Sequence, residues 1–141
     1  MGGWVEEQYL SYVYAATCAR ENGDDQHVIM AILCAAYELL PDRPEAVYHI
    51  IDILQGSKQY VHAQVWCDVA MRQCEHSNTS YTLFTNSDYH AYWFAHQYAI
   101  NAYYALHTTG SKRTAIECIE RVLRSSAPEN VKNVAQANLR W

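Results

Sequence analysis

Apolar residues recur at spacings of three and four along most of the chain, which is the period of an amphipathic helix. Three stretches show this clearly: Val28, Ile32, Ala35 and Leu39; Tyr60, Ala63, Cys67 and Ala70; and Ala115, Ile119 and Val122. No stretch has the alternation of apolar and polar residues that marks a half-buried strand. The pattern therefore predicts seven helices, at about 5–22, 25–40, 44–55, 58–75, 88–108, 112–125 and 128–139.

Glycines mark the ends of three of these helices. Each glycine precedes a residue that favours the start of a helix, in the steps Gly23-Asp24, Gly56-Ser57 and Gly110-Ser111. Glycine ends a helix readily because it adopts the left-handed backbone conformation without strain. Asp and Ser cap the next helix by accepting a hydrogen bond from its free N–H groups. Each step is thus expected to be a tight turn between antiparallel helices.

The spacing of these glycines indicates a repeat of two helices. Gly23 and Gly56 are 33 residues apart, close to the 34-residue period of the tetratricopeptide repeat. Gly56 and Gly110 are 54 residues apart, so about 20 additional residues are expected, in the polar stretch from His76 to Ser87. The predicted fold is a single all-α domain over 1–141, an α-solenoid of tetratricopeptide-like helix hairpins. Its hairpins and closing helix are expected at about 5–40, 44–75, 88–125 and 128–139.

Proline marks the start of two predicted helices. The segment Asp42-Arg43-Pro44-Glu45 combines a capping residue, an early proline and a Glu three residues after the Asp, and Ser126-Ala127-Pro128-Glu129 repeats the arrangement. We therefore expect Asp42 and Ser126 to cap the helices that follow them.

The composition is that of a folded, acidic domain. Of the 141 residues, 50% are hydrophobic and 18% are charged, and the net charge is −5. This charge argues against a nucleic-acid partner, since phosphate binding needs clustered Lys and Arg. No apolar run approaches the roughly 20 residues needed to cross a bilayer, and no signal peptide is visible. The cysteines form no Cys-x-x-Cys pair, which favours reduced thiols and a cytoplasmic location: Cys18, Cys34, Cys67, Cys74 and Cys118.

Several segments resemble one known family beyond the generic repeat. The opening Gly2-Gly3-Trp4-Val5-Glu6-Glu7 is similar to the "GGW-x-EE" segment of the tetratricopeptide-like region behind the catalytic domain in family-2-type glycosyltransferases of bacteria and large viruses. Ala36-Tyr37-Glu38, followed by Pro41, Arg43 and Glu45, resembles that family's "AYE…P-x-R-x-E" junction. Later similarities are Leu83-Phe84, Asp88, Ala99-Ile100, Ala102-Tyr103-Tyr104, Gly110, the helix Cys118-Ile119-Glu120-Arg121-Val122-Leu123, and Asn138. The resemblance implies the accessory repeat region of such an enzyme.

The sequence departs from this family in ways that bear on activity. Where the family tends to have Tyr, Trp and an acidic residue, this chain has His90, Tyr92 and Gln97, so any role of a carboxylate there is lost. A nucleotide-sugar transferase of that type needs a βαβ domain and an Asp-x-Asp motif that holds a divalent metal, and this sequence has neither. The adjacent pair Asp24-Asp25 lies at a helix start, where capping explains it. The resemblance therefore does not imply activity.

The histidines and cysteines give no metal or catalytic signature. A helical metal site places ligands at i and i+3 or i+4, but His90 and His96 are six residues apart and His76 lies two residues from Cys74. The sequence contains no nucleophile elbow, glycine-rich loop or zincin helix. Cys67 and Cys74 share a helical face and are expected to be core residues. We therefore predict no metal, no cofactor and no catalytic residues.

Aromatic residues concentrate on the predicted first helices of the hairpins, which line the concave face in this architecture. They are Tyr9, Tyr12, Tyr48, Tyr92, Trp93, Tyr98, Tyr103 and Tyr104. Tyrosine suits a binding groove because it combines an apolar ring with a hydroxyl group; the alternative is that most of these rings pack between repeats. The register of the glycines places these residues in the groove: Thr17, Arg20, Tyr48, Asp52, Gln55, Gln97, Tyr104 and His107. The set lacks the basic cluster that would clamp a terminal carboxylate.

The sequence therefore predicts a non-catalytic binding or scaffolding module, related to the accessory repeat region of a glycosyltransferase. Its partner is expected to be a protein or peptide, such as a glycosyltransferase catalytic domain or the acceptor of that enzyme. Two alternatives stay open: a free-standing adaptor that binds a peptide segment, and a small helical enzyme whose catalytic residues are far apart in the sequence.

Overall fold

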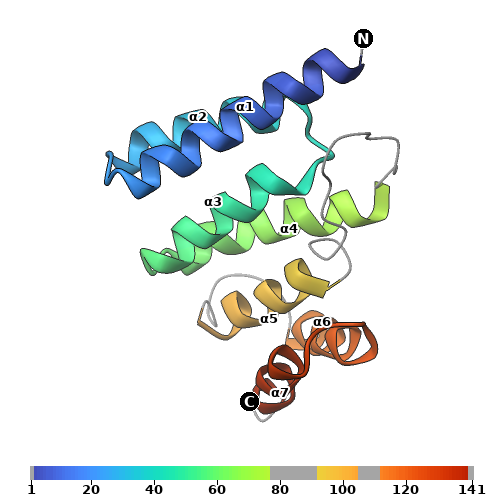
Figure 1. Ribbon diagram of the computed structural model, residues 1–141. Coiled ribbons are helices and arrows are strands. Elements are labelled where there is room, and N and C mark those ends of the chain that lie inside the picture. Colours follow the sequence, from blue (N-terminus) through green and yellow to red (C-terminus); the bar gives the residue numbers. More distant parts are fainter. Residues whose placement is uncertain (1, 77–91, 105–111, 140–141) are drawn as a thin grey trace.

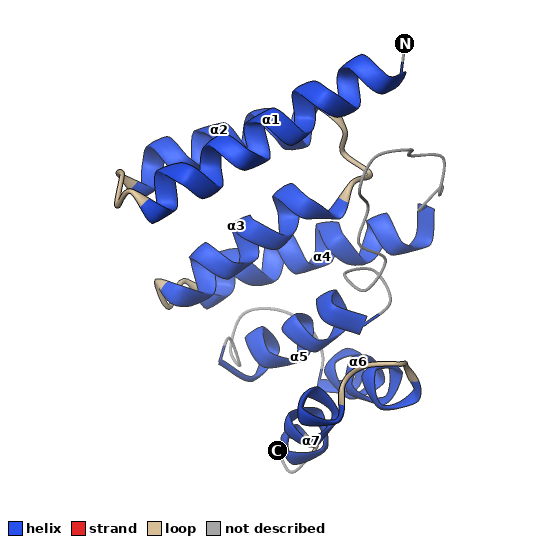
Figure 2. Cartoon of the chain, viewed as in Figure 1, coloured by secondary structure: helices blue, strands red, loops and turns tan. Residues whose placement is uncertain are grey.

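The computed structural model describes residues 2–76, 92–104 and 112–139. Figure 2 shows that the regular elements in these residues are helices, with no strand among them. They are α1 (Gly2–Glu21), α2 (Gln26–Leu39), α3 (Pro44–Gly56), α4 (Tyr60–His76), α5 (Phe94–Tyr104), α6 (Lys112–Arg124) and α7 (Glu129–Asn138). The prediction of an all-helical fold is thus confirmed for these residues. The polar stretch after His76 and the Gly110-Ser111 step lie outside the described residues.

Helices that are consecutive in the chain pack against each other, as expected for helical hairpins. We call α1 and α2 hairpin 1, and α3 and α4 hairpin 2. In Figure 1, α1, α3 and α5 lie on the near side of the molecule, and α2 and α4 lie behind α1 and α3. At the other end, α7 packs against both α6 and α5. Within the described residues, no helix has the length and apolar character that crossing a membrane requires.

The turn of hairpin 1 forms at Gly23, as predicted. Gly23 has a left-handed backbone with a φ of 76°, and the Asp24 N–H donates to the Ala19 carbonyl over 3.0 Å. This bonding closes the end of α1 in the manner of a Schellman motif. The cap of α2 is Asp25 rather than Asp24, because the Asp25 carboxylate accepts a hydrogen bond from the His27 N–H at 2.7 Å.

The turn of hairpin 2 corrects the sequence prediction, because Gly56 is not the hinge. Gly56 is the last residue of α3, and Lys58 adopts the left-handed conformation with a φ of 60°. The Gln59 N–H donates to the Leu54 carbonyl over 2.9 Å, which repeats the bonding of the first turn. Ser57 caps the end of α3 and does not start α4. A lysine in this conformation costs about 1–2 kcal/mol, and the two bonds that close the motif offset part of this cost.

The predicted caps of α3 and α7 are also wrong by one or two residues. Arg43 and Pro128 occupy the N-cap positions, and neither side chain makes a capping hydrogen bond to the backbone of the helix that follows. Pro44 is the first residue of α3, as predicted. Asp42 is displaced from the capping position because Glu45 binds the Arg43 side chain, which fixes the chain entering α3.

Buried residues of hairpin 1 recur in hairpin 2 at a spacing of 34 positions. The pairs are Val13 and Val47, Ala16 and Ile50, Ala19 and Ile53, Ile29 and Ala63, Leu33 and Cys67, and Ala36 and Ala70, all at most 8% exposed. The spacing of four and three in the second helices appears once more in α6, at Ala115, Ile119 and Val122, which are also buried. Residues 34 positions apart in hairpin 1 and hairpin 2 are therefore buried alike.

The buried face of α2 is shifted by one residue from the stripe seen in the sequence. Ile29, Leu33 and Ala36 are buried, whereas Val28 is 52% exposed and Ile32 is half-buried. Both sets have helical spacing, and α2 is apolar on more than half of its circumference. The sequence alone thus fails to tell which of two adjacent apolar stripes faces hairpin 2.

Candidate functional site

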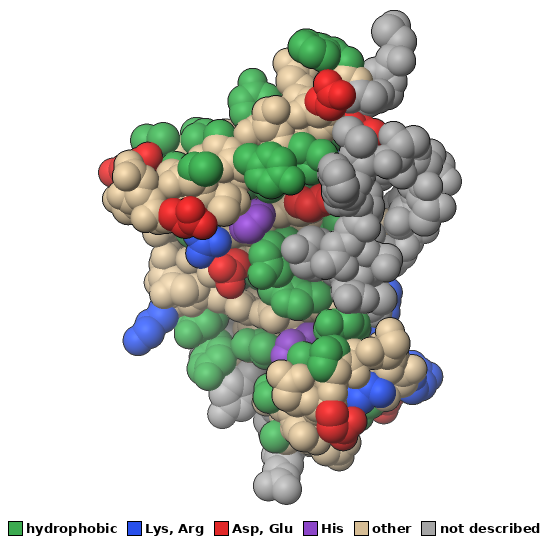
Figure 3. Space-filling model, viewed as in Figure 1, with side chains coloured by type: hydrophobic (Ala, Val, Ile, Leu, Met, Phe, Trp, Pro, Cys, Tyr) green, Lys and Arg blue, Asp and Glu red, His purple; other side chains and the backbone are tan. Residues whose placement is uncertain are grey.

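Side chains from α1, from α3 and from the residue directly before α5 meet on one side of the molecule. The Nη2 atom of Arg20 lies 3.0 Å from Oδ2 of Asp52, joining α1 to α3. The rings of Tyr48 and Trp93 lie 4.4 Å apart between centroids, joining α3 to the chain that enters α5. We call these four residues the first-helix face. Figure 3 shows this side of the molecule, with acidic, basic, histidine and hydrophobic groups interspersed across its middle.

The charged part of the first-helix face is open to solvent. The side chains of Arg20 and Asp52 are 35% and 45% exposed, so their ion pair is worth only about 0–1 kcal/mol. Burial and then the charge of Asp52 raise the pKa of Tyr48, which keeps its hydroxyl protonated and able to donate a hydrogen bond. A pair this weak can exchange one partner for a polar group of a ligand at little cost.

His49 adjoins the first-helix face and was not identified from the sequence. Its ring meets that of Tyr48 edge-on, with centroids 5.0 Å apart. Burial and then the charge of Arg20 lower the pKa of His49, so the neutral imidazole is favoured. Its Nδ1 atom is buried and makes no hydrogen bond within the described part of the chain. The only feature of the sequence that could have pointed to His49 was its position next to Tyr48.

A pocket of about 310 Å³ lies beside the Arg20–Asp52 pair, between the turns of the two hairpins. Arg20, Asp24, Asp52 and Ser57 supply polar groups to its lining, and Ile29 is among its apolar residues. Its volume is at the lower end of the range for small-ligand sites, about 300–1,000 Å³. The first-helix face thus continues into a concave, polar recess that admits a side chain of a partner.

Five of the eight residues predicted for the groove lie along α1 and α3. Arg20, Tyr48 and Asp52 belong to the first-helix face. Thr17 lies about one turn before Arg20 on α1, half-buried, and its hydroxyl donates to the Val13 carbonyl over 3.0 Å. Gln55 follows Asp52 on α3 and is half-buried.

The other three residues predicted for the groove lie on or after α5. Gln97 is only 8% exposed, so its side chain is packed among helices. Tyr104 is 58% exposed and stacks on Tyr60 of α4, with ring centroids 4.5 Å apart. His107 lies outside the described residues. The structure therefore brings Tyr104 to the contact of α4 and α5 and does not join it to the Arg20–Asp52 pair.

Two aromatic residues expected on the first helices serve packing instead. Tyr9 is fully buried and Tyr98 is 4% exposed. Tyr9 belongs to the polar joint described next, and Tyr98 contributes to the largest core cluster. For these two residues, the alternative that the rings pack between helices is the correct one.

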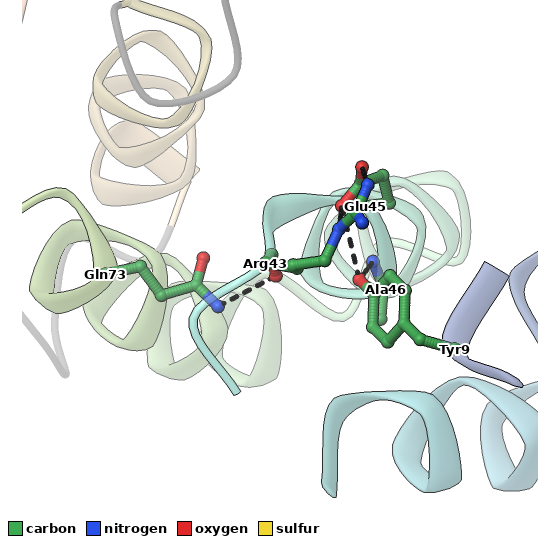
Figure 4. Close-up of polar contacts among 5 residues, drawn as sticks. All are labelled: Tyr9, Arg43, Glu45, Ala46 and Gln73. Carbon is green, nitrogen blue, oxygen red and sulfur yellow. Dashed lines mark hydrogen bonds and ion pairs between the residues drawn. The ribbon is translucent and has the colours of Figure 1, made fainter. Parts of the chain in front are cut away.

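A buried polar joint connects hairpin 1 with hairpin 2, as Figure 4 shows. The guanidinium of Arg43 donates to both carboxylate oxygens of Glu45, at 3.2 and 2.7 Å. The Ala46 N–H donates to the Tyr9 hydroxyl at 2.8 Å, and this hydroxyl lies 3.5 Å from Glu45. Gln73 of α4 donates to the Arg43 carbonyl at 3.1 Å. Arg43 and Glu45, which carry part of the family resemblance, therefore have a structural role that does not require catalysis.

The electrostatics of this joint fit that role. Burial alone would lower the pKa of Arg43, but its hydrogen bonds to Glu45 and the negative charge there raise it above its ordinary value. Burial, together with the same carboxylate, raises the pKa of Tyr9. The Arg43 guanidinium therefore stays charged and the Tyr9 phenol stays neutral at physiological pH.

Metal binding and thiol chemistry find no support in the described residues. No three side chains among their His, Cys, Asp and Glu lie close enough to hold a metal ion. Cys67 is fully buried, and burial raises the pKa of its thiol. Since the thiolate is the nucleophile, Cys67 behaves as a core residue, as predicted. The side chain of Cys74 lies outside the described ones.

In comparisons with known proteins, no family model matches the chain, and neither a curated protein nor a solved structure matches it. The resemblance to the repeat region of glycosyltransferases therefore stays a prediction.

Proposed function

We propose that the chain is a non-catalytic binding module, an α-solenoid of tetratricopeptide-like hairpins that holds a protein or peptide against the first-helix face. The observation that carries the proposal is the pair of contacts on one side of the molecule, Arg20–Asp52 between α1 and α3 and Tyr48–Trp93 between α3 and the chain that enters α5. A surface assembled from successive first helices is the usual binding surface of helical-repeat proteins.

The 34-residue recurrence of buried positions supports the repeat part of the proposal. Thirty-four residues is the length of one tetratricopeptide unit, and the recurrence covers both helices of the unit, from Val13 and Val47 to Ala36 and Ala70. Small buried residues such as Ala36, Ala63 and Ala70 allow helices to approach closely, which stacking of hairpins requires.

The chemistry of the face supports a polypeptide as partner. Half-exposed aromatic rings, a solvent-accessible ion pair and a small polar recess are the features of a surface that binds side chains. The resemblance to glycosyltransferase repeat regions adds two concrete candidates, the catalytic domain of such an enzyme and its acceptor. An adjacent coding region for a βαβ domain with an Asp-x-Asp motif would favour the first candidate.

Site-specific photo-crosslinking in the native host tests the proposal. A photoreactive amino acid replaces Asp52, whose side chain is 45% exposed, and in a matched control it replaces Val65, which is 51% exposed on α4. Mass spectrometry then identifies the covalent products. We expect a defined partner from position 52 that is absent from position 65. The same products from both positions, or none from position 52, would contradict the proposal. A turnover assay on nucleotide sugars with the purified chain addresses the enzyme alternative, and no turnover is expected.

A further inference from the structure

Each residue by which hairpin 2 contacts hairpin 1 has a counterpart in hairpin 1, 34 positions earlier in the chain. Residues of α3 and α4 that make polar or ring contacts with hairpin 1 include Glu45, Ala46, Asp52 and Trp66. In the turn between these two helices, the Ser57 hydroxyl also donates to the Gln26 side chain over 3.0 Å. The counterparts of the four helix residues, 34 positions earlier, are Ser11, Tyr12, Cys18 and Ile32. The surface that hairpin 2 uses to pack on its predecessor therefore has an equivalent on hairpin 1, where no preceding hairpin exists in the described residues.

This equivalent surface is open and largely apolar. We call it the outer face; it comprises the four counterparts Ser11, Tyr12, Cys18 and Ile32, and also Trp4 and Ala15, which lie on the same side of α1 as Ser11 by helical spacing. Trp4 is 70% exposed and Tyr12 is 38% exposed, Ser11, Ala15 and Cys18 are exposed, and Ile32 is half-buried. Ser11, Ala15 and Cys18 are spaced by four and three, so they lie along one line of α1. The small side chains of Ser11, Ala15 and Cys18, with bulky Trp4 and Tyr12 beside them, leave a shallow surface on which a helix can lie.

The charge around the outer face is almost entirely negative. Residues 2–39 contain six carboxylates and a single arginine, Arg20, which is already paired with Asp52 of hairpin 2. Five of the six carboxylates are exposed: Glu7, Glu21, Asp24, Asp25 and Glu38. In Figure 3 the upper edge of the molecule, over α1 and α2, shows hydrophobic and acidic groups. Coulomb attraction over this surface favours a partner rich in Lys and Arg.

A second copy of the chain does not fit this surface. Two outer faces brought together would each contribute five exposed carboxylates to the vicinity of the interface, and like charges at an interface oppose association. At the other end of the described chain, α7 packs against α5 and α6. A copy approaching head to tail would therefore meet α7 and not an uncovered hairpin.

From these observations we propose that the outer face of hairpin 1 docks an amphipathic helix of another polypeptide, with an apolar stripe flanked by Lys and Arg. The apolar stripe covers Tyr12, Ala15 and Ile32 in the way hairpin 1 covers hairpin 2, and the basic flanks face the carboxylates around them. This site is separate from the first-helix face. The proposal for the outer face does not depend on the function proposed for the first-helix face.

A synthetic helical peptide of Leu and Lys, with its Leu residues on one stripe, serves as the probe. Its affinity for the full chain is measured by fluorescence anisotropy, and a peptide with Glu in place of Lys is the control. We expect the Leu–Lys peptide to bind at least about tenfold more tightly than the Leu–Glu peptide, and to weaken as salt screens the carboxylates. No binding of the Leu–Lys peptide would overturn the proposal.

Four lysine variants locate the bound peptide. Tyr12→Lys and Ala15→Lys place a positive charge on the outer face, and each should weaken binding about tenfold. Tyr14→Lys is the matched control, because Tyr14 is on the same helix and is 62% exposed, but its counterpart Tyr48 belongs to the first-helix face. It should change the affinity by less than about twofold, as should Asp52→Lys on the first-helix face. If Tyr12→Lys fails to fold, as judged by circular dichroism, the affinity of Ala15→Lys for the peptide tests the site instead.

Three results would overturn the proposal. Equal weakening by all four variants would mean attraction to the overall charge without a defined site. Weakening by Tyr14→Lys or Asp52→Lys alone would place the peptide on the first-helix face. A dimer in sedimentation equilibrium that Ala15→Lys dissociates would show that a second copy covers the outer face.

Discussion

Arg43 and Glu45 form a bidentate ion pair in the buried joint between the two hairpins, with Nη2 and Oε2 2.7 Å apart. The Arg43 side chain is fully buried and that of Glu45 is 11% exposed. Two residues so close in the chain hold each other at the start of α3, and Tyr9 and Gln73 attach this point to α1 and α4. The joint therefore fixes how hairpin 2 sits against hairpin 1.

Glu45→Gln is predicted to destabilise the protein strongly. The substitution keeps the shape of the side chain but removes the carboxylate that binds the buried guanidinium through both oxygens, and breaking a buried ion pair costs about 3–5 kcal/mol. The free energy of unfolding, from urea denaturation followed by circular dichroism, measures the effect. Asp52→Asn breaks the exposed pair with Arg20 and should cost less than about 1 kcal/mol. Equal costs for the two substitutions would mean that the joint is not a buried ion pair.

Two buried glutamines are predicted to respond in opposite directions to the same substitution. Gln64 is fully buried near the Tyr98 hydroxyl, whose pKa it partly lowers, yet neither of its amide atoms makes a hydrogen bond of good geometry with the described residues. Gln64→Met should raise the unfolding free energy by about 1 kcal/mol, since it removes an unsatisfied buried amide. Gln73→Met should lower it by a similar amount, since it removes the bond to the Arg43 carbonyl. Thermal unfolding of both variants provides the comparison. Melting temperatures that shift in the same direction would refute the view that Gln64 lacks hydrogen bonds while Gln73 makes one.

Overpacking at the small residues of the second helices should destabilise the stack. Ala63 and Ala115 are fully buried, so Ala63→Leu or Ala115→Leu forces neighbouring helices apart at a cost of about 1–3 kcal/mol. Ala31, which is exposed on α2, is the control position, where Leu should change the unfolding free energy by less than about 0.5 kcal/mol. Melting temperatures measure the effect. A lower melting temperature for Ala31→Leu, with none for Ala63→Leu or Ala115→Leu, would contradict close helix packing at Ala63 and Ala115.

Stability should fall as the pH drops below the ordinary pKa of histidine. Burial lowers the pKa of His49 and of His96 below their usual value of 6.5. The unfolded chain then binds protons that the folded chain does not, so the stability present above pH 6.5 is lost as the pH falls toward the lower folded pKa values. Melting curves at about pH 7.5 and 5.5 measure the loss. The double variant His49→Gln/His96→Gln should show a smaller loss; an unchanged loss would rule out these two groups as its source.

The sequence predicted the helices well because their ends are marked by local chemistry. Gly23 ends α1 through a left-handed turn, and Pro44 begins α3, as expected from their backbone preferences. The second turn was placed wrongly, since Lys58 and not Gly56 takes the left-handed conformation. A hydrogen-bonded turn can impose this conformation on lysine, and no residue preference reveals that it will. The glycine spacing of 33 is therefore not the spacing of equivalent turn residues, since Gly23 and Lys58 are 35 positions apart and buried positions recur at 34.

The candidate site was predicted only in part because it depends on contacts between helices. Arg20 and Asp52 were selected from their register, and the structure pairs them. Tyr104 was selected on the same basis, but its ring stacks on Tyr60 of α4. The buried roles of Tyr9 and Gln97 follow from how neighbouring helices cover them, which a helical period does not specify.

Binding of the crosslinked partner to matched variants tests the central claim most directly. The partner identified from position 52 is titrated by calorimetry against the wild type, Asp52→Lys and Val65→Lys. We predict that Asp52→Lys weakens binding at least about tenfold while the unfolding free energy changes by less than about 1 kcal/mol. Val65→Lys, with the same added charge on α4, should bind as the wild type does. Equal affinities for all three proteins would contradict a binding role for the first-helix face.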